Sequence, residues 1–169
     1  MTAHAGEGRA RRPGVGFLVS HPAHFVALGF GTGLSPVAPG TVGTLLAFPL
    51  YAVLDYWFAP GWVAATIAAC FVLGVWACGR TGRDLGVADH GGMNWDETVA
   101  FLAVLFLAPP GLAWQAGAFG LFRLLDVAKP PPIRHVDRKL KSGLGVMLDD
   151  VVAAFYTVLV LAAAKRILG

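Results

Sequence analysis

Three long stretches of this chain contain no Asp, Glu, Lys or Arg, and they limit its possible folds more than any other feature. Residues 56–79 and 98–122 are continuous and apolar, whereas residues 13–54 are interrupted by glycine, proline and histidine. A helix that crosses a bilayer needs about 20 mostly apolar residues. The two continuous stretches reach that length, and 151–164 reaches it only with its flanking charged residues at the interfaces. The pattern predicts an all-α integral membrane bundle.

Short turns divide these stretches into helical hairpins. Ala59-Pro60-Gly61 and Pro109-Pro110-Gly111 each interrupt an apolar segment with residues that favour turns. The helices predicted around them cover residues 45–58, 62–78, 98–107 and 112–125, and a last helix follows Asp150 and ends at Ile167.

Composition agrees with a single membrane-embedded domain. Charged residues make up 14 % of the chain and its mean hydropathy is +0.65, whereas about 25 % of the residues of a typical soluble domain are charged. We predict one domain over residues 15–169, preceded by a disordered basic tail over residues 1–14. The net charge of +3 and the lack of a basic face interleaved with aromatic residues exclude nucleic acid as an expected partner.

Most of the charge lies in two blocks, residues 80–97 and 123–150. Each block follows an apolar hairpin, so both are expected on the same side of the membrane. The second block is rich in Arg and Lys, which favour the cytoplasmic side. The polar loops are therefore predicted to gather on the cytoplasmic face.

Each block contains two adjacent acids before an apolar segment, Asp96-Glu97 and Asp149-Asp150. Helix capping explains them in part, because Asn94 and Glu97 have the spacing of a capping box and Asp149 suits a helix start. Alternatively, these four acids and Asp89 are metal ligands, since carboxylate oxygens suit Mg²⁺. Capping does not explain why an acid pair before an apolar helix occurs twice.

A segment rich in glycine and proline covers residues 29–44 and is expected to form neither a regular helix nor a strand. Two interpretations are equally supported. Its backbone N–H groups and the hydroxyls of Thr32, Ser35, Thr41 and Thr44 suit a phosphate at the start of the next helix. Otherwise it is a structural turn, with Thr41 or Thr44 as the N-cap.

Four ordered groups of motifs resemble the phosphatidylglycerophosphatase A family over nearly the whole chain after Ser20. They are Gly29-Phe30-Gly31-Thr32-Gly33-Leu34-Ser35-Pro36 with Ala38-Pro39-Gly40-Thr41-Val42-Gly43; Asp89-His90-Gly91 with Trp95-Asp96-Glu97; Phe122-Arg123 with Asp126, Lys129-Pro130 and Pro132-Ile133-Arg134; and Gly143-Leu144-Gly145-Val146-Met147 with Asp149-Asp150. The residues around Asp126 and before Trp95 depart slightly from the family pattern, but the charged positions are intact.

The resemblance implies an Mg²⁺-dependent lipid phosphatase of the bacterial inner membrane, which converts phosphatidylglycerophosphate to phosphatidylglycerol and inorganic phosphate in phospholipid biosynthesis. Its partners would be that lipid and the bilayer. The implied catalytic residues are Asp96, Glu97, Asp126, Asp149 and Asp150. The implied metal ligands are Asp89, Asp96, Glu97, Asp149 and Asp150, and the phosphate-binding residues are Arg123, Lys129, Thr32, Ser35 and Thr41. Which carboxylate activates water, and whether a covalent intermediate forms, stay open.

Two other functions would require features that this sequence does not show. A phosphoalcohol transferase would carry a long aspartate-rich signature that this chain lacks. A small membrane ion-binding or transport protein without phosphatase activity would place acids within its spans. Here only Asp55 lies between two charge-free stretches, and the acid pairs lie at segment ends.

Overall fold

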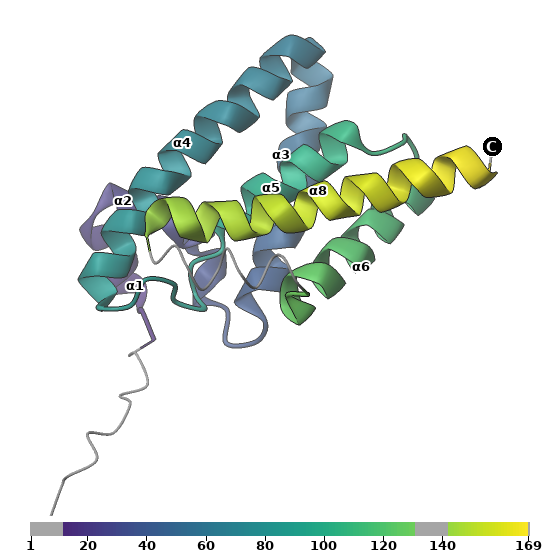
Figure 1. Cartoon of the computed structure of the whole chain (residues 1–169). Coiled ribbons are helices and arrows are strands. Elements are labelled where there is room, and N and C mark those ends of the chain that lie inside the picture. Colours follow the sequence, from purple (N-terminus) through teal and green to yellow (C-terminus); the bar gives the residue numbers. More distant parts are fainter. Residues whose placement is uncertain (1–11, 131–141, 169) are drawn as a thin grey trace, which may run out of the picture.

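A computed structural model describes residues 12–130 and 142–168, and in these ranges the secondary structure is entirely helical. The predicted all-α class is therefore confirmed. Most of the tail predicted over 1–14, and the charged segment 131–141, lie outside the described residues. The helices, shown in Figure 1, are α1 (Val15–Ser20), α2 (Pro22–Ala27), the 3₁₀-helix η1 (Gly29–Leu34), α3 (Pro39–Trp57), α4 (Pro60–Leu85), α5 (Trp95–Leu107), α6 (Leu112–Ala128) and α8 (Gly143–Leu168).

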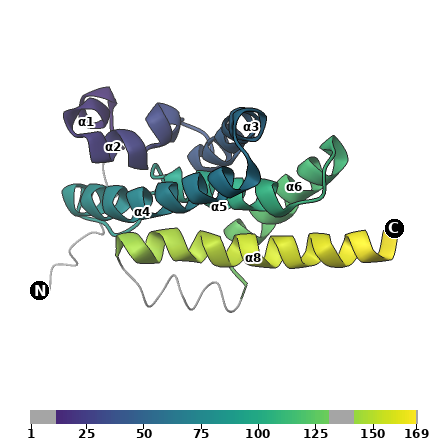
Figure 2. The same ribbon diagram turned by 90° about the horizontal axis from the view of Figure 1, so that it is seen from above.

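The core is built around α5, which packs against α3, α4 and α8. After its acidic first turn this helix is apolar on all sides, and such a helix must be buried. Phe101 at its centre is fully buried. Its ring lies 5.3 Å from that of Phe48 in α3 and 5.4 Å from that of Phe122 in α6. Figure 2 shows the layers: α1, α2 and α3 lie on one side of α4 and α5, and α8 lies on the other.

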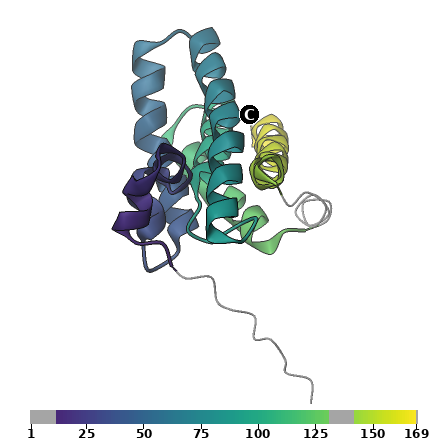
Figure 3. The same ribbon diagram turned by 90° about the vertical axis from the view of Figure 1, so that its left-hand side faces the viewer.

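Helices that follow each other in the chain are not always the closest neighbours in space. A short turn connects α3 to α4, yet α3 packs mainly against α5, and α4 packs mainly against α8 and α2 (Figure 3). Similarly, α6 contacts α8 more extensively than α5. The predicted turns and helices are present, but the main packing interfaces join helices of different hairpins.

Two of the described helices, α4 and α8, are long and apolar enough to cross a membrane. Only 22 % of the apolar window of α4 and 44 % of that of α8 is buried, whereas the core helix of a soluble protein would be mostly buried. Large apolar side chains are exposed along both helices, including Val72 and Trp76 in α4 and Phe155 and Val160 in α8. These surfaces are typical of helices in apolar surroundings.

The start of α3 differs from the sequence prediction. Helix α3 begins at Pro39, after Ala38, so residues 39–44 form its first turns instead of an irregular loop. Proline suits a first helical position because its fixed φ is helical and that position needs no N–H. Thr41 and Thr44 therefore lie inside the helix, and their predicted role as N-caps is wrong.

The start of α8 is also earlier than predicted. Helix α8 begins at Gly143, and the hydroxyl of Ser142 accepts a hydrogen bond from the Gly145 N–H at 3.3 Å. Asp149 and Asp150 consequently lie in the second turn, where the backbone N–H groups already have helical partners. The capping interpretation of Asp149 is therefore wrong, and both aspartates need another explanation.

Candidate active site

One small pocket collects every carboxylate and both cations that the sequence assigned to the site. It lies where the starts of α5 and α8 meet the end of α6, and its volume is about 250 Å³. We call it the acidic pocket. Its walls are Asp89, Gly91, Met93, Asp96, Glu97, Arg123, Asp126, Val127, Lys129, Asp149 and Asp150.

The acids of this pocket are unusually well buried. Exposure is 6 % for Asp96, 8 % for Asp126, 4 % for Asp149 and 3 % for Asp150, whereas Asp89 at the rim is exposed. Aspartate is almost never this buried unless it is paired. Such a concentration of buried carboxylates is costly for the fold, which favours a functional reason for it.

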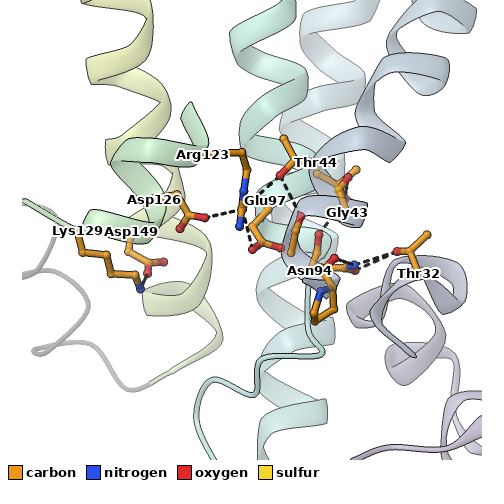
Figure 4. Close-up of polar contacts among 12 residues, drawn as sticks. Thr32, Gly43, Thr44, Asn94, Glu97, Arg123, Asp126, Lys129 and Asp149 are labelled. Carbon is orange, nitrogen blue, oxygen red and sulfur yellow. Dashed lines mark hydrogen bonds and ion pairs between the residues drawn. The ribbon is translucent and has the colours of Figure 1, made fainter. Parts of the chain in front are cut away.

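Arg123 connects three elements through one nitrogen atom. Its Nη1 donates to Glu97 Oε1 at 3.1 Å, to Asp126 Oδ2 at 2.6 Å and to Thr44 Oγ1 at 3.4 Å (Figure 4). Its Nε is buried and has no hydrogen-bond partner among the described residues. The guanidinium group is thus held by α3, α5 and its own helix, and it keeps a buried donor for a further acceptor.

Lys129 provides the second cation of the pocket. It follows the last residue of α6 with a left-handed φ of 39°, and its Nζ lies 2.6 Å from Asp149 Oδ2. A left-handed conformation is uncommon outside glycine, and Pro130 prevents the helix from continuing. The turn at the end of α6 therefore brings Lys129 to the start of α8, as Figure 4 shows.

Burial also changes the acidity of the α5 acid pair. It raises the pKa of Glu97 to about 8, with a further increase from the nearby Asp126 charge and a partial offset from Arg123. Burial, and then repulsion by Glu97 and Asp89, raises the pKa of Asp96 well above its usual range. Asp96 Oδ1 and Glu97 Oε2 are buried without hydrogen-bond partners among the described residues. These carboxylates require a proton or a cation.

The chemistry of this set fits a hard divalent cation, because its donors are carboxylate oxygens and two of them lack partners. The side chains are not arranged as a ready metal site. Within residues 12–130 and 142–168, no three His, Cys, Asp or Glu side chains are grouped closely enough to hold an ion. The donor type thus supports the predicted metal, and the present geometry does not supply a complete ligand set.

Asn94 has a different role from the predicted capping box. Its side-chain Nδ2 donates to Pro39 O at 2.8 Å and to Thr32 Oγ1 at 2.9 Å, and its backbone N–H donates to Ala27 O at 3.0 Å. The side chain makes no cap hydrogen bond, and Glu97 pairs with Arg123. The capping-box interpretation is therefore wrong. Asn94 instead ties α2, η1 and α3 to the start of α5.

The hydroxyls predicted to bind phosphate lie outside the walls of the acidic pocket. Thr32 Oγ1 donates to Gly29 O at 2.8 Å and Ser35 Oγ donates to Val37 O at 2.8 Å, so both support their own loop. Thr41 is half-buried in the first turn of α3. Their assignment to the phosphate stays a prediction.

Two residues of α3 make contacts with the side chains of the pocket that the sequence did not predict, although the Thr44 hydroxyl was a candidate for binding phosphate. Thr44 accepts the hydrogen bond from Arg123, and a Cβ at Gly40 would overlap the Glu97 carboxylate. Gly40 therefore permits the close approach of α3 to Glu97. Their four-residue spacing places both on one helix face, a signal that becomes useful only once α3 is known to begin at Pro39.

The fold and the pocket together define a class: a protein that is helical in the part of the chain that the structure describes, with buried carboxylates and two cationic side chains at one end of exposed apolar helices. Comparison with known sequences narrows this class. The sequence model of the family described as phosphatidylglycerophosphatase A matches residues 25–165. The chain belongs to the phosphatidylglycerophosphatase A family, which confirms the resemblance found in its motifs.

Individual relatives agree with this assignment. A Haemophilus influenzae protein named phosphatidylglycerophosphatase A is 46 % identical over 147 residues, which cover 86 % of this chain and 90 % of the relative. The Escherichia coli protein of that name is 41 % identical over 137 residues, covering 80 % and 78 %. A Bacteroides thetaiotaomicron protein named as a candidate phosphatidylinositol-3-phosphatase is 35 % identical over 152 residues, covering 85 % and 94 %. No solved structure matches the chain.

Proposed function

We propose that this protein hydrolyses phosphatidylglycerophosphate to phosphatidylglycerol and inorganic phosphate in phospholipid biosynthesis, and that the acidic pocket is its active site. Family membership and the names of two relatives support the reaction. The observation that carries the site is the buried Nε of Arg123, which has no partner among the described residues and belongs to a pocket lined also by Lys129 and six carboxylates.

Arg123 and Lys129 are proposed to bind the phosphate monoester. The planar guanidinium group matches two phosphoryl oxygens, and an ammonium group adds a point charge. Asp126 and Asp149 pair with these cations at 2.6 Å each, so they position the two side chains before the substrate enters. Held in this way, the cations stabilise the charge that develops on the phosphoryl oxygens.

Mg²⁺ is the proposed cofactor, held by carboxylates chosen from Asp89, Asp96, Glu97, Asp149 and Asp150. When bound, Mg²⁺ would offset the negative charge of the substrate and make a bound water more acidic. Glu97 is the best candidate in this set for accepting a proton from water, because its Oε2 is buried without a hydrogen-bond partner among the described residues. Its contact with Arg123 fixes the carboxylate in place.

A position in the bacterial inner membrane is proposed from the exposed apolar helices. The acidic pocket lies by the start of α3, and the exposed aromatic residues Tyr56, Trp57 and Trp62 lie at the other end of that helix and the start of the next. Aromatic residues favour a membrane interface. We place the pocket at the cytoplasmic interface and these aromatic residues at the opposite one, with α4 and α8 crossing the bilayer.

The direct test of the activity is phosphate release by the purified full-length protein in vesicles that contain phosphatidylglycerophosphate. We expect rapid release, and slower release from phosphatidylinositol 3-phosphate at the same surface concentration. No release from either lipid, by protein that is folded and inserted, would contradict the proposed function. Faster release from the inositol lipid would move the substrate assignment toward the Bacteroides relative.

A further inference from the structure

A second and larger pocket adjoins the acidic pocket. Its volume is about 750 Å³, and the two pockets share Asp89 and Gly91 as wall residues. Among the described residues, the other polar side chains of its wall are Arg12, Ser35 and His90. We call it the outer pocket. Because the two pockets share these wall residues, the outer pocket lies directly beside the acidic pocket.

We propose that the outer pocket binds the phosphodiester and bridging glycerol of the substrate head group while the terminal monoester lies in the acidic pocket. The inference rests on the proposed function. In phosphatidylglycerophosphate the monoester is the terminal group, so only that group needs to reach the carboxylates. The glycerol and diester follow it along the head group and need a space next to the site.

The sizes of the two pockets fit this division. A volume of about 250 Å³ is below the usual range of about 300–1,000 Å³ for ligand pockets, whereas about 750 Å³ lies within it. The acidic pocket is thus suited to one phosphoryl group with its ion and water, and the outer pocket is suited to a larger group.

Charge decides how the head group is placed in the outer pocket. A phosphodiester keeps one negative charge, and among the described residues of this wall Arg12 carries a permanent positive charge. The Asp89 carboxylate at the junction would repel a diester beside it. We therefore place the uncharged glycerol across the junction and the diester against Arg12 and His90.

The Nε2 atom of His90 is available to donate a hydrogen bond. Its Nδ1 accepts the Gly92 N–H at 3.0 Å, so the neutral imidazole must carry its hydrogen on Nε2. The side chain is half-buried in the wall of the outer pocket. It can therefore donate through Nε2 to a diester oxygen without being positively charged.

The wall that carries these groups is held in place by close backbone packing. A Cβ at Gly33 would overlap the Gly92 carbonyl oxygen, so η1 and the segment before α5 touch at these glycines. Thr32, next to Gly33, is bonded to the buried Asn94 side chain. A preformed wall lowers the entropy lost when the head group binds.

Competitive inhibition can distinguish ligand binding in the outer pocket from ligand binding in the acidic pocket. The probes are glycerophosphoglycerol, which has the diester but no monoester, and inorganic phosphate, each tested against phosphatidylglycerophosphate hydrolysis by the full-length protein. The variants are Arg12→Gln, and His90→Asn, which keeps an acceptor for the Gly92 N–H but lacks Nε2. Arg166→Gln is the matched control because it removes an exposed arginine in the last turn of α8.

We expect glycerophosphoglycerol to compete with the substrate, and each test variant to raise its inhibition constant and the substrate KM by about tenfold, as for loss of one charge-assisted hydrogen bond. The inhibition constant of inorganic phosphate and kcat should stay within about twofold, and Arg12→Lys should recover part of the loss. Lack of competition in the wild type, or equal changes for both probes, would overturn the inference. Failure of the proposed function would appear separately, as no phosphate release by the wild type.

Discussion

Two buried polar regions lie within four residues of each other at the start of α5. They differ in whether their buried polar atoms have hydrogen-bond partners. Asn94 is fully buried, and its side chain bonds to Thr32 and to the Pro39 carbonyl. In contrast, Asp96 Oδ1 and Glu97 Oε2 are buried without partners among the described residues. The cluster of Asn94, Thr32 and the Pro39 carbonyl, which we call the Asn94 cluster, stabilises the fold. The acidic pocket instead contains carboxylate oxygens without hydrogen-bond partners among the described residues, and these suit a ligand.

The largest expected effect is on turnover, from neutralising single acids of the pocket. Glu97→Gln and Asp150→Asn keep size and shape but remove a negative charge that the proposed binding of Mg²⁺ and activation of water would need. We expect phosphate release to fall by about 10²–10³-fold, with a melting temperature no lower than that of the wild type, because repulsion among buried carboxylates decreases. Phosphate release and thermal unfolding measure the two effects.

Asp55→Asn is the control for these variants, because Asp55 is an exposed carboxylate near the other end of α3. It should keep nearly full activity. Folded Glu97→Gln and Asp150→Asn variants with wild-type turnover would show that these two acids are not needed for catalysis. The acidic pocket would then have only a structural role, like the hydrogen bonds of Asn94.

A smaller loss of turnover is expected for Arg123→Lys. The substitution keeps the charge but loses the planar guanidinium group and its buried Nε, the donor that has no partner among the described residues. We expect kcat/KM to fall by about 10- to 100-fold, as for the loss of one or two charge-assisted hydrogen bonds. Steady-state kinetics would show this, and an unchanged kcat/KM would mean that a point charge at this position is sufficient.

Asn94→Ala should lower stability more than turnover, the opposite of the effect expected for the substitutions of the acids. Removing the amide leaves Thr32 Oγ1 and the Pro39 carbonyl without their buried partner, which costs about 1–3 kcal/mol per unsatisfied group. The free energy of unfolding should therefore fall, while the turnover of the folded fraction falls much less than in Glu97→Gln. Denaturant unfolding with activity per folded molecule checks this. Equal stability of the variant and the wild type would show that the Asn94 cluster does not hold the fold.

The smallest expected effect is a dependence of stability on pH in the metal-free protein. The pKa of Glu97 is raised from 4.5 to about 8, so between these values the folded protein binds a proton that the unfolded chain has released. The contribution of Glu97 to stability should be fully present below about pH 4.5 and should decrease as the pH rises toward 8. Melting temperatures in EDTA at pH 5 and pH 8 should differ by several degrees. Glu97→Gln should reduce this difference, and an equal difference in the variant would assign it to other groups.

The sequence predicted the helices well, because charge-free stretches and the two Pro-Gly turns depend mainly on local composition. It also identified the carboxylates and cations that the fold brings together at the ends of α5, α6 and α8. The first turns of α3 and α8 were missed. Gly40, Gly43 and Gly143 are poor helix formers by themselves, but they are needed where helix surfaces approach Glu97, Asn94 and Gly79 closely.

The role of Asn94 could also not be predicted from the sequence. A side chain three residues before a glutamate has the spacing of a capping box, and only the tertiary fold brings Thr32 and the Pro39 carbonyl within 2.9 Å of its amide nitrogen. Once these contacts form, the amide is occupied and Glu97 is available to Arg123. Local spacing therefore gave the right residues and the wrong interaction.

The metal dependence of phosphate release tests whether the buried unpartnered oxygens of the acidic pocket hold a divalent cation that is used in hydrolysis. Full-length protein in vesicles of phosphatidylglycerophosphate would be treated with EDTA, assayed, and assayed again after excess Mg²⁺ is added. We expect EDTA to abolish phosphate release, and Mg²⁺ to restore it in the wild type but not in Glu97→Gln. Full activity of the metal-free protein would contradict this expectation.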